Sequence, residues 1–358
     1  MSRVRAVRGL LRSGFLSSLL LCPVLLGPTS LTAHAQTATG SLVGIVTDPS
    51  GGVVANANVT IRAAATNAIR KQKTNDSGEY SVLALAPGGY VVTVEAPGYA
   101  NSELRVTVPV GETVNGDVKL AVGSSTSSVT VTSLSLNPVN TVEAIVQDVI
   151  GPKEIDSLPL NGRNFLDLAQ LNPGVQIQDG GNLDPTKQGF VGVSLQGRTG
   201  RSTRVEVDGV DITDDTVGTT TMNLSQDSIQ EFQTAKSTLD PASSVTTAGA
   251  VNVITRSGTN QVHGAGFYLF RNDATAAKLS AQKSAFDRSQ TGFRLGGPFL
   301  KDRLFWFVNY EHTLQHGTTI AAPAAQFSQF ASNFSTPFHE ALTTERLDWN
   351  LSQNWRAF

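Results

Sequence analysis

Residues 304–311, Leu-Phe-Trp-Phe-Val-Asn-Tyr-Glu, decide the fold of the C-terminal part of this 358-residue chain. Two faces alternate along the stretch, one apolar and aromatic and the other more polar. The first face carries Leu304, Trp306, Val308 and Tyr310, and the second carries Phe307, Asn309 and Glu311. The alternation predicts a strand of a transmembrane β-barrel, although a soluble sheet with one wet face has the same pattern.

The lengths of the connections separate these two interpretations. Further alternating strands are indicated at 264–270, 293–295 and 347–351. The connections between strands are in turn long, short, long and short: residues 271–290, Lys301-Asp302, residues 313–344 and Ser352-Gln353-Asn354. A barrel that begins on the periplasmic side has this order, because its outward loops are long and its periplasmic turns are short.

A barrel that encloses a plug has about 22 strands of roughly ten residues each. Residues 260–358 can supply only a few of these strands, so we expect the start of an incomplete transmembrane β-barrel. Open strand edges leave backbone polar groups unsatisfied in hydrocarbon. The sequence therefore predicts a fragment of a longer protein that transports nothing by itself.

The N-terminal residues have the composition of a secretory signal. Arg3, Arg5, Arg8 and Arg12 precede a short apolar run at 15–26, and Ala33-His34-Ala35 form a cleavage site before Gln36. We expect a signal peptide at 1–35 that is cleaved between Ala35 and Gln36. The single cysteine, Cys22, lies inside it, so no thiol or disulfide chemistry is expected in the mature chain.

Charge excludes one class of partner. The chain has 27 Lys and Arg against 29 Asp and Glu, and charged residues are only 16% of the total. Removal of the four arginines leaves 23 − 29 = −6. A negative chain without a basic stripe does not favour nucleic acid as a partner.

Residues 36–121 are predicted to form a β-sandwich of about seven strands. Short alternating stretches such as Ala57, Val59 and Ile61 are separated by turn sequences at roughly ten-residue intervals. Residues 44–59, 75–80 and 87–90 (Pro-Gly-Gly-Tyr) closely resemble the carboxypeptidase regulatory-like domain, a carbohydrate-binding-like, prealbumin-type sandwich. No His-x-x-Glu zinc pair is present, so no peptidase is implied.

The middle of the chain is predicted to be a linker followed by a small α+β domain. Residues 122–145 open with Gly-Ser-Ser-Thr-Ser-Ser at 123–128, which is typical of a flexible linker. In residues 146–259, Phe165, Leu168 and Ala169 have helical spacing, and Asn172-Pro173-Gly174 ends that helix. Strands are indicated around 205–210, with a tight turn at Asp208-Gly209, and at 229–232 and 250–255.

Several motifs in this part resemble one family. They are Leu-Pro-Leu-Asn-Gly-Arg-Asn-Phe at 158–165, Leu-Asn-Pro-Gly-Val at 171–175, Leu-Gln-Gly-Arg at 195–198, Val-Asp-Gly-Val at 207–210, Ser-Ile-Gln-Glu-Phe at 228–232 and Gly-Ala-Val-Asn-Val-Ile-Thr-Arg-Ser-Gly-Thr-Asn at 249–260. The chain resembles TonB-dependent outer-membrane receptors, specifically the Oar-like branch, which also carries the N-terminal sandwich. The resemblance implies a plug domain at 146–259 and barrel strands from 260 onward.

The resemblance also implies a function and partners. The chain would take part in energy-coupled uptake of a nutrient at the cell outer membrane, with the TonB complex as partner, and would need no catalytic residue and no cofactor. Ser128–Ser133 resembles a TonB box, with Val129, Thr130, Val131 and Thr132 as the partner-binding residues. Extended β-formers suit strand addition, although the last strand of the sandwich or a plain linker would have the same composition. Nutrient contacts are expected around 179–188 and 211–221.

Two other functions remain open at this point. An outer-membrane-anchored adhesion or glycan-binding protein would use the sandwich for binding and the barrel as an anchor, with a glycan as ligand. A soluble periplasmic enzyme is poorly supported, because Gly192-Val-Ser194-Leu-Gln196 lacks the closing glycine of a nucleophile elbow.

No metal site is expected from the candidate ligands. His312 and His316 are interpreted as solvated residues at a strand end and its loop. The four aspartates at 208, 211, 214 and 215 miss the calcium-loop spacing and are interpreted as a polar turn.

Overall fold

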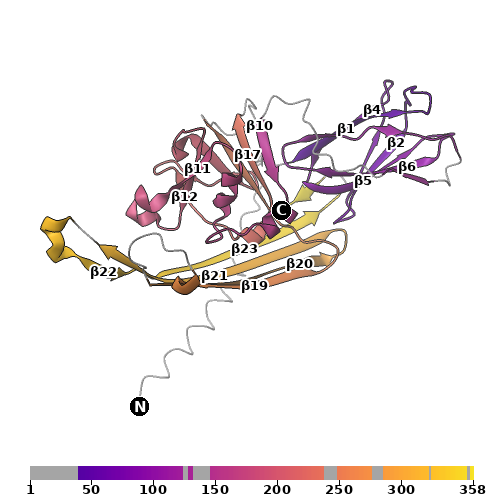
Figure 1. Cartoon of the computed structure of the whole chain (residues 1–358). Helices are drawn as coiled ribbons and strands as arrows, with labels where there is room; N and C mark the ends of the chain where they lie inside the picture. Colours follow the sequence, from indigo (N-terminus) through magenta and orange to yellow (C-terminus); the bar gives the residue numbers. More distant parts are fainter. Residues whose placement is uncertain are drawn as a thin grey trace, which may run out of the picture. The chain divides into compact units, whose positions relative to one another are not determined.

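The computed structural model describes residues 39–123, 128–131, 146–237, 248–275, 285–321, 324–352 and 355–358. The signal peptide predicted at 1–35, its cleavage site at Ala35 and Gln36, and Thr132 of the candidate TonB box lie outside these residues. The described chain is mostly β, as the sequence predicts (Figure 1). No helix in it is both long enough and apolar enough to cross a membrane.

The N-terminal domain is a sandwich of two sheets. One sheet has the order β4-β1-β7, with β8 also paired to β1, and the other has the order β3-β2-β5-β6-β9. The strands are β1 (Gly40–Thr47), β2 (Asn58–Ala63), β3 (Ile69–Lys73), β4 (Glu79–Leu85), β5 (Gly88–Glu95), β6 (Asn101–Val108), β7 (Thr113–Asn115), β8 (Val118–Lys119) and β9 (Ser128–Val131).

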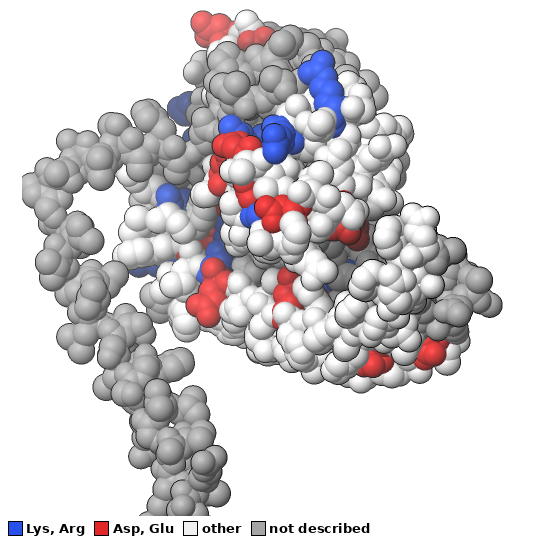
Figure 2. Space-filling view, turned by 90° about the vertical axis from the view of Figure 1, so that its left-hand side faces the viewer, with Lys and Arg blue, Asp and Glu red and all other residues white. Residues whose placement is uncertain are grey.

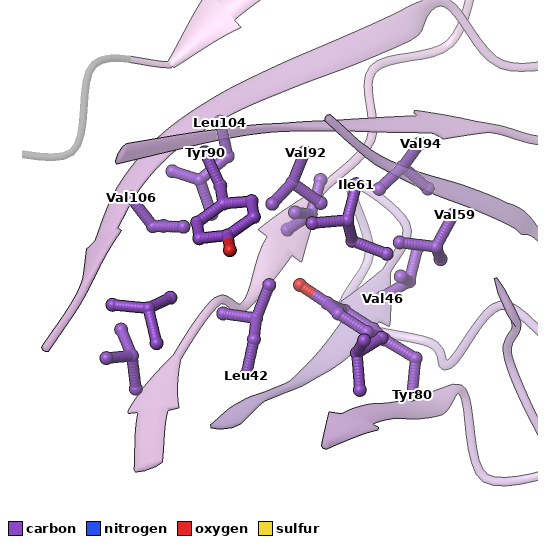
Figure 3. Close-up of a cluster of buried hydrophobic side chains, with 14 of the residues drawn as sticks. Leu42, Val46, Val59, Ile61, Tyr80, Tyr90, Val92, Val94, Leu104 and Val106 are labelled. Atoms are coloured by element: carbon purple, nitrogen blue, oxygen red, sulfur yellow. The ribbon is translucent and has the colours of Figure 1, made fainter. Parts of the chain in front are cut away.

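The core of the sandwich is made by the inward positions of both sheets. Figure 3 shows Tyr80 of β4 and Tyr90 of β5 among aliphatic side chains that include Leu42, Val59 and Ile61. The Tyr80 hydroxyl donates to the carbonyl of Gly116 at 2.6 Å, so its polar end is satisfied inside the core. Burial raises the pKa of Tyr80, and it raises the pKa of Tyr90 to about 12.

The structure has more strands here than the seven that the sequence predicts. The additional strand β3 has the sequence Ile-Arg-Lys-Gln-Lys and lies at the end of its sheet, where its residues are partly or fully exposed. A polar edge strand shows no apolar alternation, so periodicity cannot detect it. The strand β9 is the second addition, and it contains Val129, Thr130 and Val131 of the candidate TonB box.

Residues 146–259, called the middle domain below, are built on a mixed sheet with the order β10-β17-β18-β13-β14. Its elements are β10 (Val146–Ile150), α1 (Pro152–Ser157), the 3-10 helix η1 (Phe165–Leu171), the hairpin β11 (Val175–Asp179) and β12 (Val191–Leu195), β13 (Thr203–Val207), β14 (Val210–Asp211), β17 (Ile229–Ser237) and β18 (Gly249–Thr255). Short pieces between them are η2 (Gly180–Asn182), η3 (Pro185–Lys187), η4 (Gly200–Ser202), β15 (Thr213–Asp214), β16 (Thr219–Thr220) and η5 (Gln226–Ser228).

The helix predicted around Phe165 is present as η1. The side chain of Asn164 caps it by accepting from the N–H of Leu166, and Phe165, Leu166 and Leu168 are fully buried. They pack with Ile229 and residues of β17 and β18 in the core of the domain. Helix α1 is not predicted, since only one of its residues, Ile155, is buried.

The C-terminal sheet is antiparallel and has the order β19-β20-β21-β23-β24, with β22 paired to β21. Figure 1 shows β19, β20, β21 and β23 as long strands side by side. Their bounds are β19 (His263–Asn272), β20 (Phe286–Leu300), β21 (Leu304–Ala321), β22 (Ser332–Ser335), β23 (Phe338–Asn350) and β24 (Arg356–Ala357), with η6 (Asp273–Thr275) and η7 (Ala325–Phe330) in the long connections.

These strands extend further than the sequence predicts. The residues expected in loops that belong to β19, β20, β21 and β23 are 271–272, 286–290, 313–321 and 338–344. The loop position expected for His316 is therefore wrong, because the polar sequences that suggested a loop continue the backbone pairing. His312 and His316 both lie within β21, and His316 approaches Asp287 at 3.0 Å. The alternation of long and short connections is kept.

Candidate functional site

The inner face of the C-terminal sheet is covered, and its outer face is apolar and exposed. Along β21, Phe305, Asn309 and Glu311 are 0–2% exposed, whereas the alternate residue Tyr310 is 38% exposed. Exposed apolar residues continue on the neighbouring strands as Phe293, Leu295, Leu347 and Trp349. An apolar outer face beside a polar inner face is the pattern of membrane-spanning strands.

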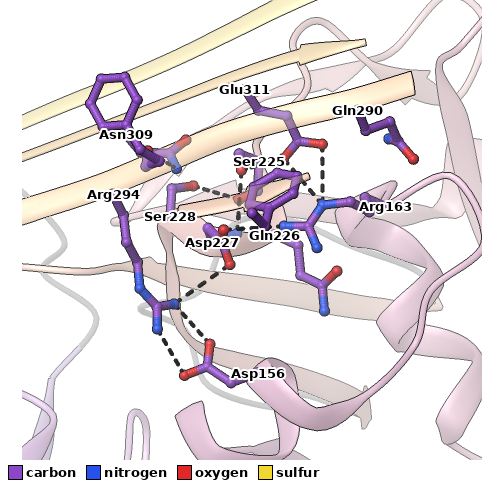
Figure 4. Close-up of polar contacts among 12 residues, drawn as sticks. Asp156, Arg163, Ser225, Gln226, Asp227, Ser228, Gln290, Arg294, Asn309 and Glu311 are labelled. Carbon is purple, nitrogen blue, oxygen red and sulfur yellow. Dashed lines mark hydrogen bonds and ion pairs between the residues drawn. The ribbon is translucent and has the colours of Figure 1, made fainter. Parts of the chain in front are cut away.

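Arg163 of the middle domain joins Glu311 of β21 (Figure 4). Its Nε lies 3.2 Å from Glu311 Oε1, and the hydroxyl of Ser225 donates to Glu311 Oε2 at 2.6 Å. The side chains of Arg163 and Glu311 are only 12% and 3% exposed. Arg163 has a positive φ of 60° and follows Gly162 at 96°, so a left-handed turn aims the arginine at the sheet.

A second contact connects α1 with β20. Asp156 receives two hydrogen bonds from Arg294, at 2.8 and 3.1 Å, and one from Arg256 at 2.7 Å. Burial alone would raise the pKa of Asp156, but the two arginines hold it below its usual value. Figure 4 shows Arg294 reaching from its strand to Asp156. Nη1 of Arg294 also lies 3.6 Å from Oδ1 of Asp227.

A third contact is centred on Arg346 of β23. It donates to Asp208 at 2.9 Å and to the hydroxyl of Thr255 at 2.9 Å, both in the middle domain. It also pairs with Asp348 of its own strand, which Arg356 of β24 contacts from the other side. Asp208 has a φ of 50° in the tight turn between β13 and β14, as the Asp-Gly sequence predicts.

The four aspartates considered as calcium ligands all have basic partners. Asp208 pairs with Arg346, and Asp211 and Asp215 both pair with Arg204 at 2.7 and 3.2 Å. Asp214 pairs with Lys187. Among the described residues no group of three acids, histidines or cysteines could hold a metal ion.

The structure brings together the two loops in which nutrient contacts were expected. The ion pair of Lys187 and Asp214 connects residues 179–188 with residues 211–221, and it holds the pKa of Asp214 below its usual value. Gly180 lies so close to Phe190 and Thr219 that a Cβ would meet the Phe190 carbonyl at 2.6 Å. Asn223 donates to Glu340 near the start of β23 at 2.9 Å. The loops therefore meet at the end of the sheet that carries the long connections.

Val129, Thr130 and Val131 of the candidate TonB box lie in β9, which pairs in parallel with β6 of the sandwich. The sequence left a last strand of the sandwich open as an alternative, and β9 occupies that place. The segment is extended, as strand addition to a partner requires.

The charged contacts between the middle domain and the C-terminal sheet were not predicted. Alternation assigned Arg294, Asn309 and Glu311 to a polar face, but the partners of these residues lie far away along the chain. Arg163 is 148 residues from Glu311, and Asp156 is 138 residues from Arg294. Such pairs require knowledge of the fold.

Comparison with known proteins gives two family matches. Residues 41–121 match the carboxypeptidase regulatory-like domain, and residues 254–349 match an outer membrane beta barrel domain. The TonB-dependent transporter Oar of Myxococcus xanthus is 27% identical over 324 residues, which cover 81% of this chain and 28% of that protein. The chain thus spans little more than a quarter of the length of this curated relative.

Two solved structures are similar over 57% of the chain. The siderophore receptor PirA from Acinetobacter baumannii is 19% identical with a TM-score of 0.34, and 29% of it is covered. The outer membrane transporter YddB from Escherichia coli is 13% identical with a TM-score of 0.43, and 31% of it is covered. With its sandwich and barrel-domain matches in the order of the sequence, the chain is similar to the Oar-like TonB-dependent transporters of the outer membrane.

Proposed function

We propose that this chain forms the N-terminal part of a TonB-dependent receptor that takes up a scarce nutrient in an energy-coupled manner. Residues 146–259 act as the plug, and β19 to β24 are strands of the surrounding barrel. The receptor performs no covalent chemistry. Its ligand is a small nutrient of undetermined class, with a glycan as one candidate.

The observation that carries the proposal is the polar contact between the plug and the inner face of the barrel strands. Arg163, Asp156 and Asp208 of the plug meet Glu311, Arg294 and Arg346 of the strands. When such a contact opens, water can solvate the separated charges, whereas an apolar interface would expose hydrophobic surface at about 25 cal/mol per Å². A polar contact therefore suits a plug that has to move and return.

The ends of the plug are suited to two different tasks. The loops joined by Lys187 and Asp214 lie beside the long connections of the sheet, which are the outward ones in this family of barrels. They are placed for contact with the nutrient. The segment at 128–131 precedes the plug in the chain, where a pull by TonB would be transmitted to β10.

The experiment is deletion of residues 128–133 from the whole receptor in living cells. Uptake of radiolabelled ferric siderophore, cobalamin, a maltooligosaccharide and a peptide is measured with and without an uncoupler. We expect one of these uptakes to depend on the energised membrane and to be lost on deletion. Deletion of six residues at 136–141 of the same linker is the matched control.

The same experiment separates uptake from adhesion. A surface-anchored binding protein would keep its ligand bound at the cell surface after deletion of 128–133, and an uncoupler would have no effect on it. Energy-independent binding of a ligand without accumulation inside the cell would therefore contradict the proposed function.

A further inference from the structure

The segment Ser128–Val131 is already part of a sheet in this structure. As β9 it pairs in parallel with the first half of β6, in the register Asn101 to Ser128, Ser102 to Val129, Glu103 to Thr130 and Leu104 to Val131. The order β3-β2-β5-β6-β9 places β9 last, and no other described strand pairs with its outer edge. A strand at the end of a sheet offers backbone N–H and C=O groups to a further strand.

The connection to β9 is short, which favours this pairing. The N–H of Ala100 donates to the carbonyl of Ala121 at 2.8 Å, and Tyr99 and Val122 form a bridge. Only residues 123–127 separate this fixed point from β9. A short connection keeps the effective concentration of the segment at the β6 edge high.

The sheet that holds β9 does not depend on it. β6 pairs with β5 in antiparallel orientation, from Gly88 opposite Val108 to Val94 opposite Ser102. The inward apolar side chains of β6 belong to the core of the sandwich. The β6 edge is therefore a rigid template that exists before β9 joins it.

We propose that the sandwich presents Ser128–Val131 to TonB as a preformed strand, and that TonB adds to the open outer edge of β9 as the next strand of the sheet. The inference rests on the proposed function and assigns a role to the sandwich within it. A segment held extended has already lost the conformational freedom that strand addition otherwise costs. The apparent dissociation constant falls as the fraction of molecules with the competent strand rises.

Two variants test the proposal in opposite directions. In the first, Glu103→Cys and Thr130→Cys are combined, because paired strands lie about 4.7–4.9 Å apart, within the range of a disulfide. Cys22, the only native cysteine, lies in the signal peptide expected to be removed. In the second, twenty Gly and Ser residues are inserted after Gly123, which lowers the effective concentration of the segment by roughly tenfold.

Binding of the purified periplasmic C-terminal domain of TonB, from the bacterium that makes this chain, is measured by interferometry. We expect the oxidised Glu103→Cys/Thr130→Cys protein to bind at least as tightly as the reduced one. The insertion should weaken binding by up to about tenfold, and the disulfide should restore it in the inserted protein. A disulfide from Thr60→Cys and Thr93→Cys, paired outward positions of β2 and β5, should change nothing.

The other outcomes distinguish the inference from the proposed function. If the disulfide abolishes binding and the insertion tightens it, the sandwich sequesters the segment, and the inference is wrong while uptake through TonB stands. If positions 103 and 130 do not cross-link although positions 60 and 93 do, the pairing itself is refuted. If the cross-link forms and no form of the protein binds the TonB domain, the proposed function fails together with the inference.

Discussion

Two buried glutamates have different hydrogen-bond partners. Glu311 faces the guanidinium of Arg163, whereas Glu231 of β17 accepts a hydrogen bond from the neutral N–H of Val110 at 2.9 Å. Burial raises the pKa of Glu231 to about 7, and the hydrogen bond from Val110 offsets only part of that effect. Protonation of Glu231 should therefore change stability near neutral pH.

Replacement of Glu231 by Gln should remove a pH dependence of stability. The pKa of Glu231 is about 7 in the folded chain against 4.5 for the free side chain, so its contribution is fully present below pH 4.5 and is lost as the pH rises through 7. The loss amounts to roughly 3 kcal/mol for a group this buried. Urea titrations from pH 4 to 8 should show the decline in the native chain and a nearly flat profile for Glu231→Gln. The same flat profile in the exposed control Glu95→Gln would contradict this assignment.

Among the strands, β18 begins at a position that only glycine fits. Gly249 has a φ of 146°, and a Cβ there would lie 2.2 Å from the carbonyl oxygen of Ala235 on β17. Gly88, at the start of β5, has the same φ but no atom within 4 Å of its Cβ position. A comparison of Gly249 with Gly88 therefore separates the cost of a positive φ from the cost of a steric clash.

Gly249→Ala should therefore destabilise the chain more than Gly88→Ala. Both variants bear the cost of a Cβ at positive φ, and only the first forces β17 and β18 apart, at about 1–3 kcal/mol more. Free energies of unfolding from urea titration give the difference. Equal losses in the two variants would show that β17 and β18 adjust to the methyl group.

The sandwich strands should be able to fold without the rest of the chain. Residues 38–121 contain both sheets except β9, and their core residues come from these strands alone. Val59→Asp places a charge at a position that is 1% exposed, at a cost of several kcal/mol, and should abolish the cooperative melt of the isolated segment. Thr60→Asp, on the outward side of the same strand, should retain it. Circular dichroism melts decide the matter, and an unfolded native segment would refute the predicted domain.

Elements with one buried face could be predicted from the sequence, and elements without such a face could not. The strands β2 and β5 alternate inward and outward, and so does the first part of β21. By contrast, β3 is polar along its length, and α1 buries one residue, so neither has a periodic signal. The start of β20 and the end of β21 were missed because their polar residues resemble loop sequence.

At the scale of the whole molecule, the order of the sandwich, the middle domain and the C-terminal sheet could be predicted from the sequence. The contacts between the middle domain and the C-terminal sheet could not. A polar inner face on the barrel strands predicts that something polar covers it. Which arginine meets which carboxylate depends on the fold, since Arg346 reaches Asp208 across 138 residues of sequence. The same contacts determine how firmly the middle domain is held against the sheet.

The final prediction concerns the strength of the contact between Arg163 and Glu311. Arg163→Met leaves the carboxylate of Glu311 buried without its cation, which should cost about 3–5 kcal/mol. Glu311→Gln keeps an acceptor for Ser225 and leaves Arg163 near Asp227 at 3.4 Å, so its cost should be nearer 1–2 kcal/mol.

In the Arg163→Met background, Glu311→Gln should therefore stabilise the chain by roughly 2 kcal/mol, because it removes the stranded charge. Unfolding in detergent by urea, followed by tryptophan fluorescence, measures all four members of the cycle. The control cycle uses Lys236→Met and Asp148→Asn, whose carboxylate is 46% exposed, and its coupling should stay below about 1 kcal/mol. Strictly additive losses at Arg163 and Glu311 would mean that water already solvates this contact, and the ion pair would then not hold the middle domain against the sheet.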